Sequence, residues 1–333
     1  MININKAVMH ILDCRSEVKV FSEQEMDLTN SNAVKFITKH IEKSSKDSDM
    51  RSGYLNENSR FYSQLKAYLD GAVSFVEFSI WIADLMYETI KSSDKPESSD
   101  MFLCDVAIDD VRQIVLLKCL NKVGYTHQVT HENGMIQNEV IKHFSILPST
   151  TQRMDSFAFI NTEPTMVKFL DKNYSVDGQE TALLSEVLLE CSFTKSTKET
   201  VKLMNLVSET VAENFGANAV EAVAAVKNCM IESLEDSDSI DPVAMGRQVF
   251  ASSPGMQKAF AEELASVGIS EPISVEKVFV GRANKMHKIK TDTGIEVSFP
   301  VDYYHNDDFI EFINKPDGTL AIELKNIGQI TNK

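Results

Sequence analysis

Residues 101 to 120 read MFLCDVAIDDVRQIVLLKCL, two apolar runs separated by Asp109 and Asp110. Both runs are rich in aliphatic and β-branched residues, and a pair of acids between such runs is typical of a turn. The stretch therefore predicts a central antiparallel hairpin. Another extended run, FAFIN, ends at Asn161 and supplies a further strand, so an antiparallel sheet is expected in the first half of the chain.

The residues before this hairpin add a strand pair and two helices. Ala7 to Leu12 is a short apolar run, and Val18 to Phe21 is its expected hairpin partner. Residues 30–43 and 74–90 carry apolar side chains at helical spacing, and the second is the strongest helix signal in the first half. Trp81, the only tryptophan, lies in that helix and is expected to pack in the core rather than to stack on a base.

The second half changes from helical to extended patterning. We expect an N-terminal α+β domain over residues 1–175, an antiparallel sheet with helices, followed by a C-terminal domain over residues 176–333. Residues 181–268 should form a helical layer, and residues 273–330 a small β module of two hairpins. The fold class is therefore α+β.

The first C-terminal hairpin is expected across the Asp-Thr-Gly turn at residues 292–294. Side chains alternate between the two faces of a strand, which places Lys288 and Lys290 on the solvent side near Glu296. The side chains expected on the opposite face are those of Ile289, Ile295, Val297 and Phe299. The second hairpin is expected across the Lys-Pro-Asp-Gly sequence, with Leu320, Ile322 and Leu324 pointing inward.

Composition limits the class of protein. The 333 residues carry a net charge of -16 and 43% hydrophobic residues, which fits a globular protein and excludes a disordered or fibrous one. The five cysteines are scattered and mostly apolar in context, so we expect free thiols in a reducing compartment. The N-terminus lacks a signal-peptide pattern, and no apolar run approaches membrane-spanning length. A cytoplasmic protein without membrane contact is expected.

A metal-dependent nuclease site is the first catalytic pattern to test. Pro316-Asp317 is followed by Glu323 and Lys325, the residue types that share Mg²⁺ and hold water in such enzymes. Six extended residues span roughly 20 Å, whereas ligands of one Mg²⁺ lie about 2.1 Å from the ion. A turn and the exposed side of a strand explain these residues better.

The remaining candidate sites are also weak. His127 and His131 lie four residues apart, but not as HExxH, and the Asn-Gly sequence after them favours a loop with ordinary histidines. Asp105, Asp109 and Asp110 cluster without a histidine or a phosphate-binding loop. No serine-hydrolase, Walker, dinucleotide or CxxC motif occurs. We therefore expect no enzyme, no metal site and no cofactor.

Charge points instead to a binding surface. Residues 281–290 read GRANKMHKIK, with Arg282, Lys285, Lys288 and Lys290 and no acid, and we call these four residues the basic strip. Because repulsion from the rest of the protein is screened over about 8 Å at physiological ionic strength, a local strip of this kind can meet a polyanion. The alternative to a binding surface is that these residues form the ordinary solvated face of a hairpin, without a partner.

Two other charged segments compete with the basic strip. Lys35, Lys39 and Lys43 form a row at helical spacing, but nearby acids favour a solvated face there. Residues 232–241, ESLEDSDSID, are strongly acidic and are read as a solvated helix end and linker or as a protein-binding surface.

Several segments in order resemble the bacterial nucleoid-associated protein family known as NdpA or YejK. They are ININKAVMHILD, SFVEFSIWIADLMYETI, MFLCDVAIDDVRQIVLLKCLN, ILPSTTQRMDSFAFIN, KIKTDTGIEVSFPVDYY and NKPDGTLAIELKNIG. The resemblance covers residues 2–328 and implies a bacterial, cytoplasmic, nucleoid-associated protein that binds DNA without catalysis. It brings no set of DNA-contacting residues, and the acidity of this chain departs from what extensive coating of DNA requires.

The sequence thus supports a nucleoid-associated, non-enzymatic protein that contacts phosphates of double-stranded DNA through the basic strip, with weak sequence preference. The alternative is an acidic interaction module that binds a DNA-handling partner and reaches the nucleoid indirectly. A homodimer is compatible with either hypothesis, and an unrecognised nuclease is the third.

Overall fold

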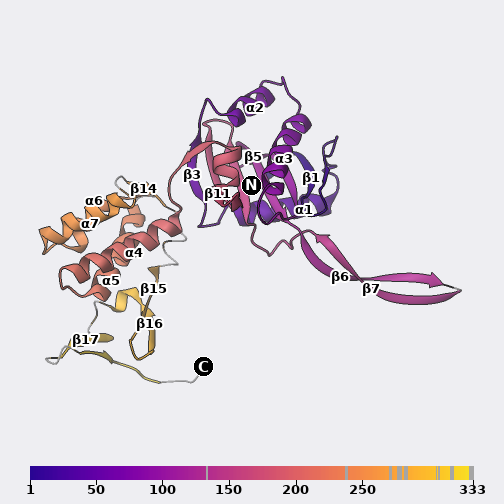
Figure 1. Cartoon of the computed structure of the whole chain (residues 1–333). Helices are drawn as coiled ribbons and strands as arrows, with labels where there is room; N and C mark the ends of the chain where they lie inside the picture. The colour runs from indigo at the N-terminus through magenta and orange to yellow at the C-terminus, as the bar shows by residue number, and fades with distance from the viewer. Residues whose placement is uncertain are drawn as a thin grey trace. The chain divides into compact units, whose positions relative to one another are not determined.

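The computed structural model describes residues 1–132, 134–236, 239–269, 272–275, 280, 284–304, 306, 308–315 and 319–329. Contacts divide the chain into two compact units, Met1–Lys195 and Ser196–Lys333. The first contains a large antiparallel sheet, and the second contains helices followed by two small hairpins (Figure 1), so the expected α+β class is confirmed. None of the helices in these described ranges combines the length and the hydropathy needed to cross a membrane.

The first unit extends beyond residue 175, where the sequence placed the boundary. The π-helix η1 (Leu183–Leu188) buries Leu183, Leu184 and Leu188 in the core of this unit. Short strands precede and follow it, and a six-residue helix carries too few turns to show a period in the sequence. The helical layer consequently begins with α4 (Thr197–Asn214), not at residue 181.

The sheet of the first unit has the strand order β12-β3-β9-β8-β5-β4-β1-β2, and all neighbours are antiparallel. Its strands are β1 (Ile2–Asp13), β2 (Val18–Val20), β3 (Arg51–Leu55), β4 (Ser99–Ile108), β5 (Val111–Leu120), β8 (Ser156–Asn161), β9 (Met166–Leu170) and β12 (Cys191–Phe193). The predicted hairpin is β4–β5. Its turn residues Asp109 and Asp110 have φ of 46° and 67°, as a two-residue turn of the primed type requires.

Both faces of this sheet are buried. In β4, Met101 and Leu103 belong to one core cluster, while Phe102, Cys104 and Val106 belong to another. Neighbouring side chains point to opposite faces, so the unbroken apolar run is what a strand with two covered faces needs. The sequence MFLCDVAI therefore fits a strand of a sheet that forms the middle layer of a three-layer unit.

Helices cover each face of the sheet. The helix α3 (Phe75–Lys91) packs on the first cluster, together with α2 (Arg60–Leu69), and α1 (Ser31–Ser44) packs on the second. A capping box between Ser74 and Glu77 fixes the start of α3. Trp81 is partly buried against the first cluster, 6.2 Å from the Phe61 ring, which agrees with its expected packing role.

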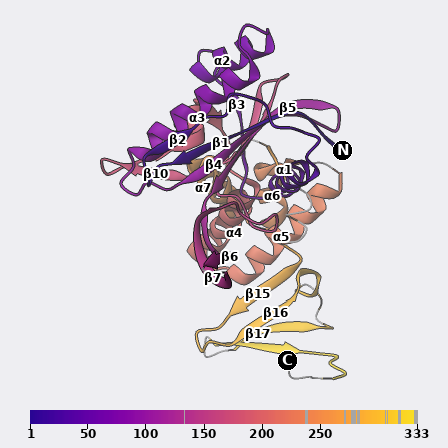
Figure 2. The same cartoon turned by 90° about the vertical axis from the view of Figure 1, so that its right-hand side faces the viewer.

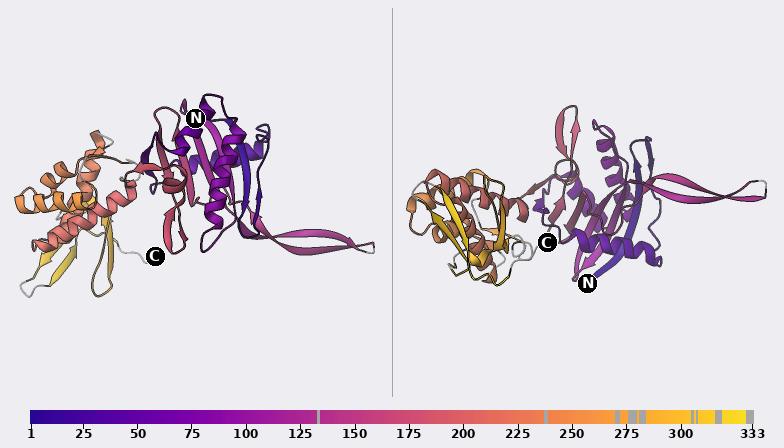
Figure 3. Two further views of the ribbon diagram at one scale, coloured as in Figure 1. Left: turned by 45° about the horizontal axis from the view of Figure 1, so that its top comes forward. Right: turned by 90° about the horizontal axis from the view of Figure 1, so that it is seen from below.

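A long two-stranded ribbon leaves the first unit where the sequence predicted a loop. Its strands are β6 (Lys122–Glu132) and β7 (Met135–Ile146), and Figures 1 and 3 show it extending away from the main sheet. The loop prediction for His127 and His131 is wrong, since both lie in β6. The Asn-Gly sequence at positions 133 and 134, which favours a loop, equally favours a two-residue hairpin turn between alternating strands.

A buried lysine is held between strands on one side of the first unit. The Lys118 side chain is fully buried, and its ammonium lies 2.9 Å from Glu97 and 3.3 Å from Asp155. Lys172 also pairs with Glu97, at 2.7 Å. Burial alone raises the pKa of the Glu97 carboxyl, but Lys118, Lys172 and the Tyr174 hydroxyl outweigh it and lower that pKa to about 2. A further two-stranded hairpin, β10 (Asn173–Val176) with β11 (Gln179–Ala182), brings Tyr174 to this cluster.

The second unit begins with four helices. They are α4, α5 (Ala219–Asp236), α6 (Pro242–Val249) and α7 (Pro254–Ser266). Their apolar stripes form one core cluster that includes Met204, Val211, Met230 and Phe260. Two-residue strands, β13 (Ser239–Ile240) and β14 (Ile273–Ser274), pair beside it.

Two hairpins complete the second unit. They are β15 (Met286–Lys290) with β16 (Glu296–Pro300), and β17 (Ile310–Asn314) with β18 (Leu320–Leu324). The short 3-10 helix η2 (Val301–Tyr303) follows β16. Phe299, Tyr304 and Ile310 form one small cluster with Ala224 of α5, so both hairpins share a core against that helix (Figure 2).

A buried histidine lies in this shared core. His287 of β15 is 2% exposed and packs on the rings of Phe299 and Tyr304. The ammonium of Lys227, on α5, donates to its Nδ1 at 3.4 Å. Burial, followed by the charge of Lys227, lowers the pKa of His287 to about 4, so the ring is neutral at pH 7.

We expect Lys118→Met to lower the free energy of unfolding by about 3 kcal/mol, because the acids around a buried ammonium then lose their main compensation. Denaturant unfolding at pH 7 measures the change. Lys168→Met, at an exposed position of β9, is the control and should stay within about 0.5 kcal/mol of wild type. Equal effects of the two substitutions would contradict a stabilising role for the cluster.

Acid should loosen the β15–β16 hairpin before it unfolds the rest of the second unit. The pKa of His287 is lowered in the folded state, so its contribution is fully present above pH 6.5 and is lost as pH falls toward 4. Hydrogen-exchange protection of β15 amides should decrease by up to about tenfold per pH unit in that window. In His287→Met the decrease should be much smaller; an identical pH dependence would show that another group controls it.

Candidate nucleic-acid interface

The β15–β16 hairpin presents two residues of the basic strip, Lys288 and Lys290, on one of its two faces. Lys288 pairs across the strands with Ser298, and Lys290 with Glu296, whereas Ile289 pairs with Val297 on the other face. The prediction that Lys288 and Lys290 lie on the face opposite Ile289 is therefore correct. The hairpin ends in a turn in which Gly294 has φ of 88°, a left-handed conformation that glycine adopts without strain.

Packing on α5 fixes the orientation of this hairpin. His287, Ile289, Val297 and Phe299 face the shared core, and His287 and Phe299 are buried. Every second side chain of β15 must then point to solvent. Sequence patterning did not identify Lys227, because it lies on α5, sixty positions before its partner His287.

The four residues of the basic strip differ in their environments. Lys285 and Lys288 are exposed, and neither forms an ion pair with an acid among the described residues. Lys290 is also exposed, but its ammonium lies 3.2 Å from the Glu296 carboxylate. Arg282 lies outside the described residues. The strip thus offers two unneutralised cations, Lys285 and Lys288, and a third that is shared with an acid.

Two details of the hairpin predictions are wrong. Ile295 is 61% exposed, because it lies in the turn beyond the last strand pair, Lys290 with Glu296. Leu324 is 50% exposed at the end of β18, although Ile322 packs inward as expected. Strand ends lie beyond the area that the small core covers, so alternation alone does not predict burial there.

The lysine row of α1 is mostly occupied by intramolecular contacts. Lys39 forms an ion pair with Glu42 at 2.7 Å, and Lys43 donates to the carbonyl of Thr151. Lys35 is exposed. These contacts favour the solvated face that the sequence indicated. The row and the basic strip belong to different units.

The acidic candidates for metal binding have other partners. Asp105 accepts from Arg112 at 2.6 Å and from the Tyr68 hydroxyl at 2.7 Å, and Asp109 pairs with the amino terminus. His127 and His131 are four residues apart on one strand, hence about 13 Å. Within the part of the chain that the structure describes, no group of three or more His, Cys, Asp or Glu residues has metal-binding geometry. Asp317 lies outside the described residues.

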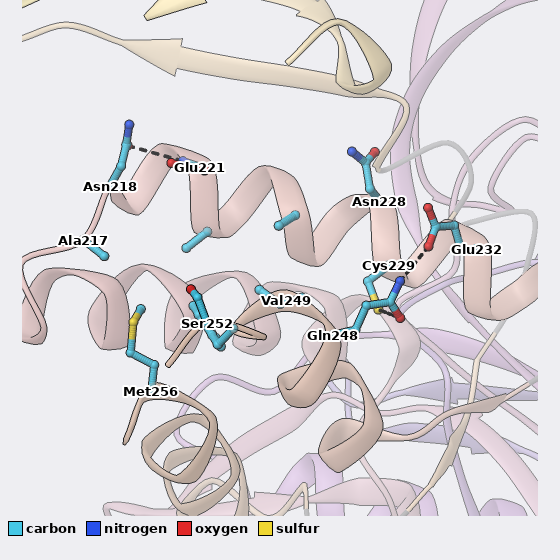
Figure 4. A pocket seen from close by; sticks show the side chains of 13 residues that line it. Ala217, Asn218, Glu221, Asn228, Cys229, Glu232, Gln248, Val249, Ser252 and Met256 are labelled. Carbon is cyan, nitrogen blue, oxygen red and sulfur yellow. Dashed lines mark hydrogen bonds between the residues drawn. The ribbon is translucent and has the colours of Figure 1, made fainter. Parts of the chain in front are cut away.

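A separate cavity of about 480 Å³ lies in the second unit, bordered by α5 and α6. Figure 4 shows its polar lining, which includes Asn218, Glu221, Asn228 and Glu232. The Glu232 carboxylate accepts from the Gln248 amide at 2.8 Å. The described residues that line the cavity include two carboxylates and no lysine or arginine, so it suits a basic group and disfavours a phosphate.

Comparison with known proteins gives a family assignment. A family model described as nucleoid-associated protein YejK matches residues 8–331 of the 333-residue chain. No curated protein matches the sequence. The matched region includes both units and the β15–β16 hairpin. The chain therefore belongs to the nucleoid-associated protein YejK family.

Proposed function

We propose that this protein is a non-enzymatic, nucleoid-associated protein that binds double-stranded DNA directly through the basic strip. The observation that carries the proposal is a pair of exposed lysines without an acidic partner among the described residues: Lys288 on β15, whose orientation is fixed by its core, and Lys285 directly before that strand. Family membership supplies the nucleoid context. Arg282 is included in the proposed interface on its sequence position alone.

The chemistry of the strip favours phosphate contacts over base reading. A lysine ammonium is a compact point charge and lacks the planar fork with which arginine recognises guanine. Phosphate contacts position a protein on DNA without reporting its sequence. Lys288 and Lys290 are two residues apart on one strand, so their Cα atoms lie about 7 Å apart along one side of the hairpin. Weak sequence preference follows.

The net charge of -16 sets the conditions under which such a strip works. At low salt the acidic remainder of the protein repels DNA over long distances, while near physiological salt repulsion beyond about 8 Å is screened. Few cations are available, so the number of phosphate contacts is small and binding is modest. A local contact of this kind suits transient association with the nucleoid better than extensive coating.

Charge reversal of the two free lysines tests the interface. We expect Lys285→Glu with Lys288→Glu to weaken DNA binding about tenfold or more and to reduce the slope of log affinity against log salt by about 2. Fluorescence anisotropy with a random-sequence duplex gives both numbers. Lys202→Glu with Lys258→Glu, at exposed positions of α4 and α7 in the same unit, adds the same charge and is the matched control. Unchanged affinity and slope in the double variant would contradict the assignment.

The ion pair of Lys290 makes a second, opposite prediction. Glu296→Gln removes the carboxylate that neutralises Lys290, so we expect DNA affinity to increase by about 2- to 5-fold, with a steeper salt dependence. Lys290→Gln should then cost less affinity in wild type than in the Glu296→Gln background. If Glu296→Gln leaves the affinity as it was, Lys290 does not face DNA.

The acidic cavity favours a second function, binding of a basic segment of a DNA-handling protein. Glu221 and Glu232 line it, and Glu232 opens the acidic sequence 232–241 named above. This function predicts that protein partners are retained from nuclease-treated lysate and are lost in Glu221→Lys. Purified wild-type protein that binds no duplex at either low or physiological salt, yet retains such partners, would make this the main function.

A further inference from the structure

One face of the β6–β7 ribbon carries most of the ribbon's solvent-exposed apolar side chains, which alternate there with two histidines, an asparagine and a lysine. Cross-strand pairing places Tyr125, Val129, Ile136 and Val140 on the same face, and these side chains are 72%, 50%, 69% and 78% exposed. Phe144, 64% exposed, continues this face, since the Lys142 ammonium lies 4.9 Å from its ring centre. We call these five residues the ribbon face.

The reverse side of the ribbon is mostly polar, and its apolar residues among the paired positions are Met135 and Ile141. Thr126, Gln128, Thr130, Gln137 and Glu139 alternate with the ribbon face, and the Gln137 amide donates to Glu139 at 3.1 Å. An isolated two-stranded hairpin is marginally stable in water, and three strands or an apolar contact are needed to support one. A sheet with one covered face gathers its apolar side chains on that face, and the ribbon does so in part, yet no described residue belongs to a core cluster with the ribbon face.

We propose that a second copy of this chain covers the ribbon face, so that two ribbons pack face to face about a two-fold axis. The area fits this occupant. Five side chains with these exposures offer about 500 Å² of apolar surface. Two copies therefore bury about 1,000 Å² in total, the lower bound for a specific interface. An interface at the lower end of this range is expected to hold the two copies weakly, so the dimer should dissociate on dilution.

Charge also favours a second copy over DNA. The ribbon carries Lys122 and Lys142 against Glu132 and Glu139, so its formal charge is zero, and DNA binding needs an excess of cations. The only charged residue among the register-paired positions of the apolar side is Lys142. In an antiparallel two-fold arrangement the two Lys142 side chains lie at opposite ends of the interface, so a self-complementary contact meets no like-charge repulsion there.

Sedimentation analysis of the nuclease-treated, full-length protein over the micromolar range tests the dimer. We expect a concentration-dependent dimer in wild type and a dissociation constant about 100-fold higher in Ile136→Glu with Val140→Glu, which places like charges inside the contact. Thr126→Glu with Thr130→Glu adds the same charge at the same spacing on the polar side and should dimerise like wild type. Wild-type affinity in the Ile136/Val140 variant would overturn the proposal.

A second variant separates loss of the contact from loss of folding. The ribbon supplies no residue to the two cores of the first unit, so replacing residues 125–142 by a short Gly-Ser turn should leave its melting temperature unchanged and give a monomer. A shortened chain that still dimerises like wild type would overturn the proposal. So would a monomeric wild type whose DNA affinity falls in the Ile136/Val140 variant, because the ribbon would then contact DNA.

Discussion

Two-sided burial of the β4–β5 hairpin is the constraint on which the first unit depends. Each of these strands must satisfy two apolar layers at once, with Leu103 and Leu116 on one side and Cys104 and Val115 on the other. Such strands cannot alternate apolar and polar residues, and they need helices on both sides. The positions of α1 and α3 follow from this requirement. A charged residue in such a strand must then have its own partners, as Lys118 has.

The parts of the fold that obey a single local rule were predictable from the sequence. The β4–β5 hairpin follows from its two unbroken apolar runs, whereas α3 and the inward side of β15 follow from apolar periodicity. The ribbon was not predictable by the same rule. Its alternation has the form of a strand, but histidines interrupt the apolar series at positions 127 and 131. The Asn-Gly sequence that follows fits a loop as well as a two-residue hairpin turn.

The candidate site was predictable from the sequence to the same extent, in its local pattern but not in its longer-range contacts. The alternation of side chains along a strand was enough to place Lys288 and Lys290 on the solvent side of their hairpin. It did not separate them, because the ion pair between Lys290 and Glu296 depends on cross-strand register, which decides that Lys288 faces the neutral Ser298 instead. The contact between Lys227 and His287 joins a helix to a strand, and no local pattern carries that information.

An acidic protein with two or three usable cations gains little affinity from one DNA contact. Two strips carried by one dimer change this, because the second contact becomes intramolecular and its effective concentration can reach the millimolar range. The ribbon face and the basic strip then have complementary roles. The ribbon face joins two copies of the chain, and each copy contributes one basic strip to the contact with DNA. Because the ribbon contact is apolar, its strength does not fall with salt, whereas the strip weakens steeply. Salt would therefore release the protein from DNA as an intact dimer.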